Sequence, residues 1–453
     1  MREVAQQQSL RDLQLSHDSV EELRAVSKLL DDLGERFLPQ IKEDLLAGVK
    51  HPQRGRRGMT APQVLRCLVL MKMRGLTYRE LSFQLHDSQS ARAFAGVGLT
   101  DRPPSASTLH DNISKLSPES LRGVNEAMVQ QARSERIDYG SRVAIDCTVV
   151  ESKIPYPTDS QMLRDCIRVL IRLGKRYGRP HEIGITDKTR SARKTAMRIM
   201  WSRGENRKRL YSKLLKITHA VVCQITTLID DIDEARAQAP WAVHDDKLRF
   251  DLEHFIATTR KIIDQTERRW SGEKVPASEK LVSVFEQHAD IIRKDYRTTY
   301  YGHKISVTKG RSDLILDFKV HEGNRNDADM AEELLDRQVE LYGRAPRQAV
   351  MDGAFCSRAN LDAFKGKGVK DVVFSRRRGI PIDEMAESRR IYRRLKKFRS
   401  SVERVISFVK RRCNLRKCTW SGIKGFKRYV AASVVTANLL TFARKRIAKR
   451  DTG

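Results

Sequence analysis

The first third of the chain has the hydrophobic spacing of amphipathic helices. Near the N-terminus the apolar positions recur every three or four residues, along one face of a helix: Leu23, Val26, Leu30, Leu33 and Phe37. Thr60 can cap a helix that has Pro62 near its start and runs through residues 63–75. We therefore predict a helical segment with a basic connector over 1–58 and a helical domain over 59–135.

Residues 76–99 have the pattern of a short helix, a polar turn and a second helix, as in a helix-turn-helix motif. A third element begins near 105–116, where serine and threonine precede an amphipathic run. A small helical bundle that only packs has the same pattern, so both interpretations stay open. The basic charge of the chain and the flanking arginines favour DNA contact.

The middle of the chain, residues 160–296, contains few signals for strands. Long amphipathic patterns predict helices at 163–176, 208–232 and about 247–270. Residues 188–216 are very basic, so contact with a DNA backbone is plausible there but unspecific. Helices of this kind usually serve structure or assembly, and we predict a helical insertion.

From residue 301 onward the pattern changes to that of strands. Residues 301–309 and 313–320 are joined by a Gly-Arg-Ser turn and predict a hairpin. Strands and helices then alternate: a helix over 327–343, a strand over 347–352, a helix from about Ser357, a strand over 371–375, a basic segment over 376–390 and a helix over about 394–412.

An apolar run at 143–145, followed by Asp146, predicts one more strand, before the helical middle. With 160–296 set aside, the order is strand, hairpin, helix, strand, helix, strand, helix, which is the order of the ribonuclease H-like fold. We therefore predict an α/β protein with a ribonuclease H-like catalytic core over 136–159 and 297–453. A large helical insertion would follow its first strand, and an all-helical N-terminal DNA-binding region would precede it.

Three carboxylates occupy positions that this fold would bring together. We expect Asp146 to end the first strand and Asp352, followed by Gly353, to end the strand 347–352, while Glu403 lies on the last helix. Neighbouring strand ends and a late helix converge in this fold. Each acid alone would also suit a turn or a surface ion pair, but three in this order favour a functional site.

The last helix places Glu403 at the border of its buried face. The apolar stripe of this helix consists of Phe398, Val402, Val405, Ile406 and Val409. Arg399, Glu403 and Lys410 are separated by four and seven residues, so at ~100° per residue they fall within about 40° of one another. The sequence thus predicts a carboxylate flanked by two cations at the edge of the core.

Charge narrows the class of partner. The chain has 87 Lys+Arg and 57 Asp+Glu, a net charge of +30, which attracts polyanions; nucleic acid is the usual one and an anionic membrane surface is the rival. No run reaches the ~20 apolar residues that span a bilayer, and residues 1–30 lack the pattern of a signal peptide. Seven scattered cysteines suit a reducing compartment, so we expect a cytoplasmic, nucleoid-associated protein. Cys413 and Cys418 are the only close pair, and no second pair completes a zinc site.

The densest cationic block, residues 376–417, surrounds the predicted site with sixteen Lys/Arg and four Asp/Glu. A run of charge is usually a solvated face, but beside carboxylates suited to phosphoryl transfer it is better explained as a DNA track. The candidates for DNA contact are Arg376, Arg377, Arg378, Lys396, Arg399, Lys410 and Arg411. We expect His303 to be packed or hydrogen-bonded rather than catalytic, and Trp420 to pack in the core rather than to stack on a displaced base.

The chain resembles the DDE transposases of bacterial insertion sequences, in the broad ISNCY-like group. The segments that carry the resemblance are 144–160, 300–307, 349–355 and 420–446. Arg399, Glu403 and Lys410 also match the last three members of the signature written Y-R-E-K. The sequence departs from this signature at Lys396, where the tyrosine is expected; Tyr392 lies one turn earlier.

The resemblance implies a metal-dependent DNA endonuclease and strand transferase. Asp146, Asp352 and Glu403 would hold two Mg²⁺ or Mn²⁺ ions, because hard cations prefer oxygen ligands and offset the repulsion among carboxylates. Water would nick the DNA at the end of the element, and the freed 3′-hydroxyl would attack target DNA. The partners would be double-stranded DNA, as terminal repeats and as target, and a second copy of the chain in a homodimer; no membrane partner is expected.

Three alternatives stay open. A related nuclease would share the carboxylates and cut DNA without joining ends. A catalytically inactive DNA-binding protein derived from a transposase is disfavoured because all three acids are present. A basic structural or membrane-surface protein would not explain the order of strands and acids.

Overall fold

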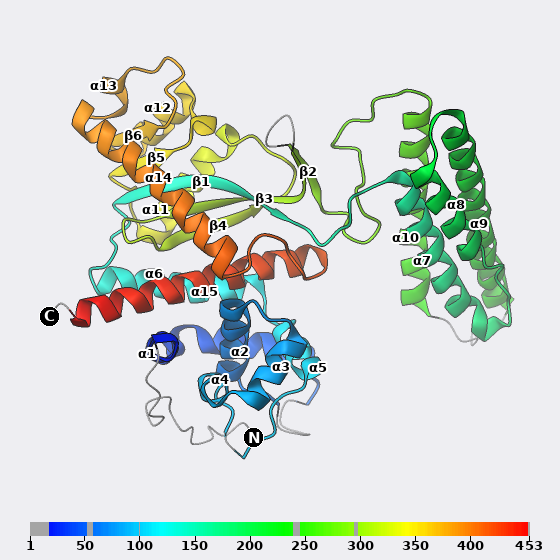
Figure 1. The fold of residues 1–453 in the computed structure, drawn as a ribbon, viewed down its shortest axis with the longest axis horizontal. Helices are drawn as coiled ribbons and strands as arrows, with labels where there is room; N and C mark the ends of the chain where they lie inside the picture. The colour runs from blue at the N-terminus through cyan, green and yellow to red at the C-terminus, as the bar shows by residue number, and fades with distance from the viewer. Residues whose placement is uncertain (1–17, 52–57, 99, 239–244, 294–297, 452–453) are drawn as a thin grey trace. The chain divides into compact units, whose positions relative to one another are not determined.

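The computed structural model contains a six-stranded mixed sheet flanked by helices, and a group of long helices that forms a separate unit (Figure 1). The structure describes residues 18–51, 58–98, 100–238, 245–293 and 298–451, so most of the predicted basic connector lies outside the described residues. One unit comprises Met1–Ser152 and His303–Gly453, and the other comprises Lys153–Gly302. No helix in the described ranges is long and apolar enough to cross a membrane.

The first unit begins with a helical region in which the predicted cap at Thr60 is present. Its helices are α1 (Asp18–Leu46), α2 (Ala61–Arg74), α3 (Tyr78–Asp87), α4 (Gln89–Ala95), α5 (Ala106–Ile113) and α6 (Pro118–Ser134). Thr60 and Thr77 form capping boxes with Gln63 and Glu80, which begin α2 and α3. The five apolar residues expected on α1 are all buried. Only Ser88 separates α3 from α4, a tighter turn than the sequence pattern suggested.

The sheet has the strand order expected of a ribonuclease H-like core. Its strands are β1 (Arg142–Glu151), β2 (Asp290–Arg293), β3 (Thr299–Lys309), β4 (Ile315–His321), β5 (Gln348–Met351) and β6 (Asp371–Phe374). The sequence did not predict β2. The strand order is β4-β3-β1-β5-β6, with β1 in the centre, and β2 pairs with the first residues of β3. β5 runs parallel to β1 and to β6, whereas β3 and β4 form the antiparallel hairpin.

The prediction that Asp146 ends the first strand is wrong. β1 continues through Thr148, Val149 and Val150, which are buried, and ends at Glu151. The backbone of Glu151 is hydrogen-bonded to the backbone of residues 416 and 418. What stops near Asp146 is the pairing with β5, which ends at Ile145 and Met351. The carboxylate therefore stands where a neighbouring strand departs, not where its own strand ends.

Helices cover both sides of the parallel part of the sheet. They are α11 (Ala331–Tyr342), α12 (Arg358–Gly366), α13 (Ile382–Met385), α14 (Arg389–Arg412) and α15 (Gly422–Asp451), with short 3-10 turns at Ala328–Met330 and Gly353–Phe355. α14 packs against β1, β5 and β6 through the predicted stripe, and crosses the sheet in Figure 1. α15 packs against α6, α1 and α2, so one hydrophobic core joins the N-terminal helices to the sheet.

The second unit has its own hydrophobic core. It contains α7 (Asp159–Gly178), a 3-10 turn at Arg179–His181, α8 (Thr189–Trp201), α9 (Gly204–Gln238) and α10 (Asp246–Trp270). α7 packs against each of the other three long helices. The predicted insertion, 160–296, falls within this unit. The sequence did not predict α8, because its buried face consists of only four residues among many cations: Ala192, Thr195, Ala196 and Ile199.

Several residues with possible chemical roles are part of the core. His303 is fully buried against Phe426, and the ring of Trp420 packs edge-on against Tyr429, as expected for both. Lys72 on α2 is buried with its Nζ 2.8 Å from the centroid of the Tyr429 ring, and burial lowers the Lys72 pKa well below its usual value. None of the seven cysteines, all of which lie in the described ranges, forms a disulfide, and Cys413 and Cys418 are buried.

Candidate active site

The parallel pairing among three neighbouring strands ends in one row, at the carboxyl ends of β5 and β6, which we call the sheet edge. The last paired residues are Ile145 on β1, Met351 on β5 and Phe374 on β6. The next residue on each chain segment is polar: Asp146, Asp352 and Ser375. Strands β1, β5 and β6 are almost uninterrupted apolar runs up to this row, as parallel strands covered on both faces require. The polar side chains therefore meet where the parallel pairing of these strands stops.

Arg399 on α14 brings all three predicted acids to one point. Its Nη2 lies 3.1 Å from Asp146 Oδ2 and 3.3 Å from Asp352 Oδ1, and its Nη1 lies 2.7 Å from Glu403 Oε1. The side chains of Arg399 and Asp146 are only 17% and 13% exposed, whereas Glu403 is 64% exposed. One guanidinium thus joins carboxylates from a central strand, a neighbouring strand and the late helix.

Asp352 is held by several donors besides Arg399. The Ser375 hydroxyl donates to Asp352 Oδ1 at 2.7 Å. Burial by itself would raise the pKa of Asp352, but the bonds from Ser375 and the Gly353 backbone and the charges of Arg399 and Arg376 outweigh it and lower the pKa. This carboxyl group is therefore ionised at neutral pH.

Gly353 is required by the local packing. A Cβ at this position would lie 2.7 Å from Cβ of Arg376, so any side chain would push the two segments apart. The chain turns directly after Asp352 into a 3-10 turn, Gly353–Phe355. The pair Asp352 and Gly353 thus lets the carboxylate stay at the strand end while the chain passes against the segment after β6.

The residue after Asp146 is no nucleophile at neutral pH. The backbone N–H of Cys147 donates to Asp146 Oδ1 at 2.8 Å, which helps to fix that carboxylate. Burial raises the pKa of the Cys147 thiol well above its usual value, and Asp327 raises it further. The thiol therefore stays protonated, and the reactive groups at this edge of the sheet are carboxylates.

The cations predicted to contact DNA lie in two different settings. Five are exposed on the segment after β6 and along α14: Arg376, Arg377, Arg378, Lys396 and Arg411. Lys410 is partly buried on α14, and Arg399 is turned toward the acids. Tyr392, the tyrosine one turn before Lys396, is buried in the core at 7% exposure, so it cannot take the place of the missing signature tyrosine at the surface.

The donor set suits a divalent metal, although Arg399 now provides the positive charge. Within the described ranges no three His, Cys, Asp or Glu side chains are arranged to hold a metal ion. Asp146 and Asp352 come from rigid strands and Glu403 from a packed helix, and carboxylate oxygens are the ligands that hard cations prefer. Their mutual repulsion needs positive charge, and the single charge of the Arg399 guanidinium supplies part of it.

Two family models match the chain. Residues 256–439 match a model described as Transposase DDE domain, and residues 9–115 match one described as Transposase domain (DUF772). Together they support a DNA-transposing enzyme of the DDE type, for which DNA is the implied partner. The searches of curated proteins and of solved structures gave no significant match. Asp352, Arg399 and Glu403 lie inside the first match, whereas Asp146 lies outside both.

Two features of the site were not predicted from the sequence. Ser375 follows the apolar run of β6 just as the two aspartates follow theirs, so the strand-end pattern could have indicated it. The bridging position of Arg399 could not be found this way, because a helical wheel relates Arg399 to Glu403 but not to the strands. Its contacts to Asp146 and Asp352 depend on how α14 crosses the sheet.

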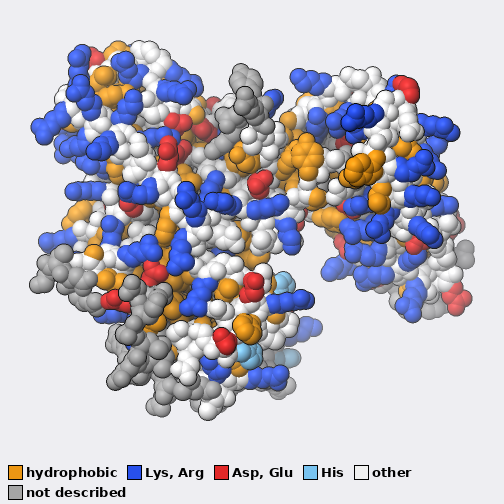
Figure 2. Space-filling model, viewed as in Figure 1, with side chains coloured by type: hydrophobic (Ala, Val, Ile, Leu, Met, Phe, Trp, Pro, Cys, Tyr) orange, Lys and Arg blue, Asp and Glu red, His pale blue; other side chains and the backbone are white. Residues whose placement is uncertain are grey.

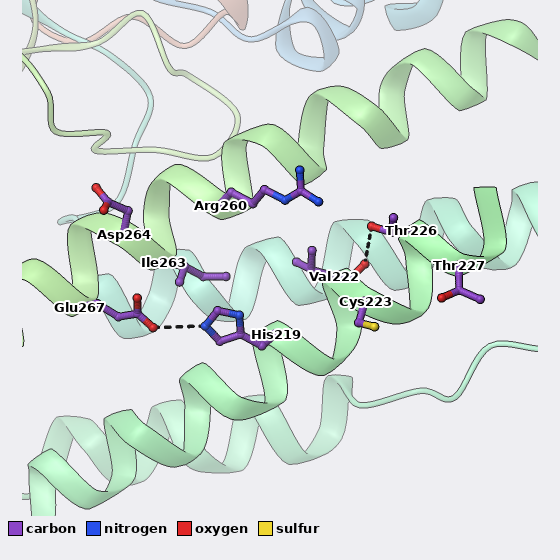
Figure 3. A pocket seen from close by; sticks show the side chains of 9 residues that line it. All are labelled: His219, Val222, Cys223, Thr226, Thr227, Arg260, Ile263, Asp264 and Glu267. Atoms are coloured by element: carbon purple, nitrogen blue, oxygen red, sulfur yellow. Dashed lines mark hydrogen bonds and ion pairs between the residues drawn. The ribbon is translucent and has the colours of Figure 1, made fainter. Parts of the chain in front are cut away.

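The second unit contains a pocket with different chemistry. It lies between α9 and α10, has a volume of about 570 Å³ and is lined by His219, Val222, Cys223, Thr226, Thr227, Arg260, Ile263, Asp264 and Glu267 (Figure 3). The His219 ring is turned to Glu267, with Nε2 3.2 Å from Oε1, and does not face Cys223. This pocket therefore has no paired base and nucleophile.

Proposed function

We propose that the protein is an insertion-sequence transposase that binds the ends of its element and catalyses metal-dependent strand cleavage and strand transfer. The carboxylates would be Asp146, Asp352 and Glu403. The observation that carries the proposal is their convergence on Arg399 from β1, β5 and α14. The Arg399, Glu403 and Lys410 spacing favours the ISNCY-like group within these enzymes.

The three carboxylates would hold two Mg²⁺ or Mn²⁺ ions. When bound, such ions activate an attacking oxygen and stabilise the leaving oxygen in phosphoryl transfer. Asp146 and Asp352 would be the rigid ligands, since the Cys147 amide and the Ser375 hydroxyl fix their orientation. Glu403, the most exposed of the three, would complete the set from α14.

Arg399 would change partners when the site is loaded. Without metal its single positive charge offsets part of the repulsion among the three acids, and with metal its guanidinium would be released from at least some of them. A released Arg399, with Lys396, Lys410, Arg411 and the exposed run Arg376–Arg378, would then contact DNA phosphates beside the carboxylates.

The remaining parts would serve recognition and assembly. The helices within 59–135 would bind the terminal repeats, and the core segments 136–159 and 297–453 would hold target and donor DNA. The helical segment 160–296 would serve assembly or DNA contact. Because pairing two element ends requires two active sites, a homodimer on DNA is the expected assembly.

An assay of cleavage and joining tests this function. The full-length protein is incubated with labelled DNA from the ends of the element and a target duplex, with Mg²⁺, with Mn²⁺ or with EDTA. Metal-dependent nicking and joined products, both lost in Asp352→Asn while DNA binding remains, would support a transposase. Nicking without joining would instead indicate a nuclease, and binding without any cleavage would indicate an inactive descendant of a transposase.

A further inference from the structure

The corner between α8 and α9 has an unusual concentration of exposed positive charge. Residues 188–216 contain eleven Lys and Arg, and Glu205 is the only acid. All eleven cations are exposed: Lys188, Arg190, Arg193, Lys194, Arg198, Arg203, Arg207, Lys208, Arg209, Lys213 and Lys216. Lys208 lies 3.8 Å from Glu205, and within the described ranges the others have no ion-pair partner. Figure 2 shows many blue side chains over this helical unit.

Large apolar side chains are exposed among these cations. Met197, Met200 and Trp201 are 52%, 70% and 85% exposed, although α8 has a separate buried face. At ~100° per residue these three, with Arg190 and Arg193, fall within an arc of about 100° on the side of α8 opposite the buried stripe. Exposed apolar side chains gathered on one face usually mark an interaction surface.

The corner is presented on a rigid support. The buried stripe of α8 packs against α7 and α9, within the core of the second unit. Trp201 is the last residue of α8, and α9 begins at Gly204, whose φ of +56° is a conformation that side-chain-bearing residues rarely adopt. Trp201 thus projects from a tight turn between two packed helices, with cations on both helices beside it.

We propose that this α8–α9 corner is a second nucleic-acid contact, which binds the backbone of a DNA duplex through its cations while Trp201 and Met200 make apolar contact in a groove. The corner is outside both matched segments, 9–115 and 256–439. The proposal rests on the proposed function for the choice of DNA. Unpaired charges that continue from α8 along the first turns of α9 fit an extended polyanion, and an apolar wedge among cations is typical of proteins that enter the minor groove.

Paired charge reversals in the full-length protein test the electrostatic part. Arg190→Glu/Arg193→Glu alters the α8 face, and Arg260→Glu/Lys261→Glu makes the same change of charge at exposed positions on α10. Binding of a fluorescein-labelled duplex is measured by anisotropy over a range of NaCl. The α8 variant should lose about tenfold or more in affinity at ~0.1 M salt, and its log–log salt slope should become less negative by roughly 2. The α10 variant should retain both values.

A tryptophan substitution tests the apolar part. Trp201→Ala should weaken duplex binding about fivefold or more and leave the salt slope unchanged, because no phosphate contact is removed. The difference in tryptophan fluorescence between the wild type and Trp201→Phe gives the emission of Trp201. This emission should be quenched when duplex is added to the wild type. Equal losses in the α8 and α10 variants would overturn the proposal, as would an unaffected Trp201→Ala variant or unquenched emission.

A vesicle-binding assay tests a membrane as the alternative ligand of the corner. DNA binding and cleavage by the wild type show whether a failure concerns the proposal alone or also the proposed function. If the α8 variant loses binding to phosphatidylserine vesicles but not to duplex, the corner is a membrane-surface contact and the proposal is wrong. If the wild type binds no duplex at any salt concentration, the transposase function fails together with the proposal. If the wild type cleaves and joins DNA while the α8 and Trp201 variants bind as it does, only the proposal fails.

Discussion

Arg399 and Arg193 carry the same guanidinium group in opposite surroundings. Arg399 is largely buried and contacts three carboxylates, whereas Arg193 is exposed on α8 within a group of cations that have almost no acidic partners in the described ranges. At the sheet edge the protein supplies both signs of charge. On the α8–α9 corner it supplies one sign and leaves the other to a ligand.

These different surroundings indicate different roles for the two arginines. A buried guanidinium among carboxylates offsets their repulsion and fixes their positions, so its loss should affect the protein itself. An exposed, unpaired cation contributes little to stability, and its effect should appear only when a polyanion binds. Substitutions at the sheet edge should therefore change activity and stability, whereas substitutions at the α8–α9 corner should change DNA binding.

The largest expected effect is on chemistry at the carboxylates. Asp146→Asn and Asp352→Asn should each lower metal-dependent strand cleavage on the order of 10³-fold or more, because each removes one of the proposed metal ligands. Glu403→Gln should lower it less, since Glu403 is more exposed and less constrained. Single-turnover cleavage rates check the ranking, with Asp362→Asn, an exposed acid on α12, as the control that keeps its activity. Equal activity in all four variants would exclude the site.

The second effect is on stability at Arg399. Arg399→Gln leaves the largely buried Asp146 and the partly exposed Asp352 without the guanidinium that contacts both, so we expect a loss of about 1–3 kcal/mol in unfolding free energy without divalent metal. Added Mg²⁺ should restore the variant by more than it stabilises the wild type, because no guanidinium has to be displaced. Urea denaturation with and without Mg²⁺ measures both quantities.

A matched variant on the same helix controls for the loss of an arginine. Arg404 pairs with Asp313 at 2.6 Å but is 70% exposed, so Arg404→Gln should cost less than about 1 kcal/mol and show no added response to Mg²⁺. If Arg399→Gln and Arg404→Gln behave alike, Arg399 has no special role in neutralising the acids.

The sequence predicted the elements of the site better than their geometry. The apolar runs before Asp146 and Asp352 and the stripe on α14 led to the correct strands, helix and order. The extent of β1 was wrong, because alternation shows where a strand is buried but not where its neighbour departs. The strand edge depends on pairing across more than 200 residues of sequence, between Ile145 and Met351, which no local pattern contains.

In the second unit, a whole helix was missed by the sequence analysis. α7, α9 and α10 were predicted from their apolar spacing, but α8 was missed because its cations and exposed apolar residues hide the period of its four buried positions. The same residues that concealed the helix, Met197, Met200 and Trp201, are those that indicate a contact surface. The sequence showed the charge of this region but not that its aromatic side chain is exposed.

The third effect concerns pH at the sheet edge. Because the folded-state pKa of Asp352 is lowered, its stabilising contribution is present above the unfolded value of ~3.9 and is lost as pH falls through the folded value. The difference in unfolding free energy between wild type and Asp352→Asn should be constant at neutral pH and shrink below about pH 4. The side chain is 39% exposed, so solvent screening limits the pH-dependent part to less than about 1 kcal/mol. Denaturation series at several pH values measure it, and a constant difference down to pH ~3 would show that the pKa is not lowered.

The smallest expected effect is on the stability of the α8–α9 corner. Arg190→Glu/Arg193→Glu removes repulsion among exposed cations and breaks no ion pair in the described ranges, so the free energy of unfolding should rise by a few tenths of a kcal/mol at low salt. At ~1 M salt, where charges are screened beyond ~3 Å, the gain should vanish. Denaturation at the two salt concentrations checks this. A loss above ~1 kcal/mol would mean that these arginines support the fold, and the contrast with Arg399 would then not hold.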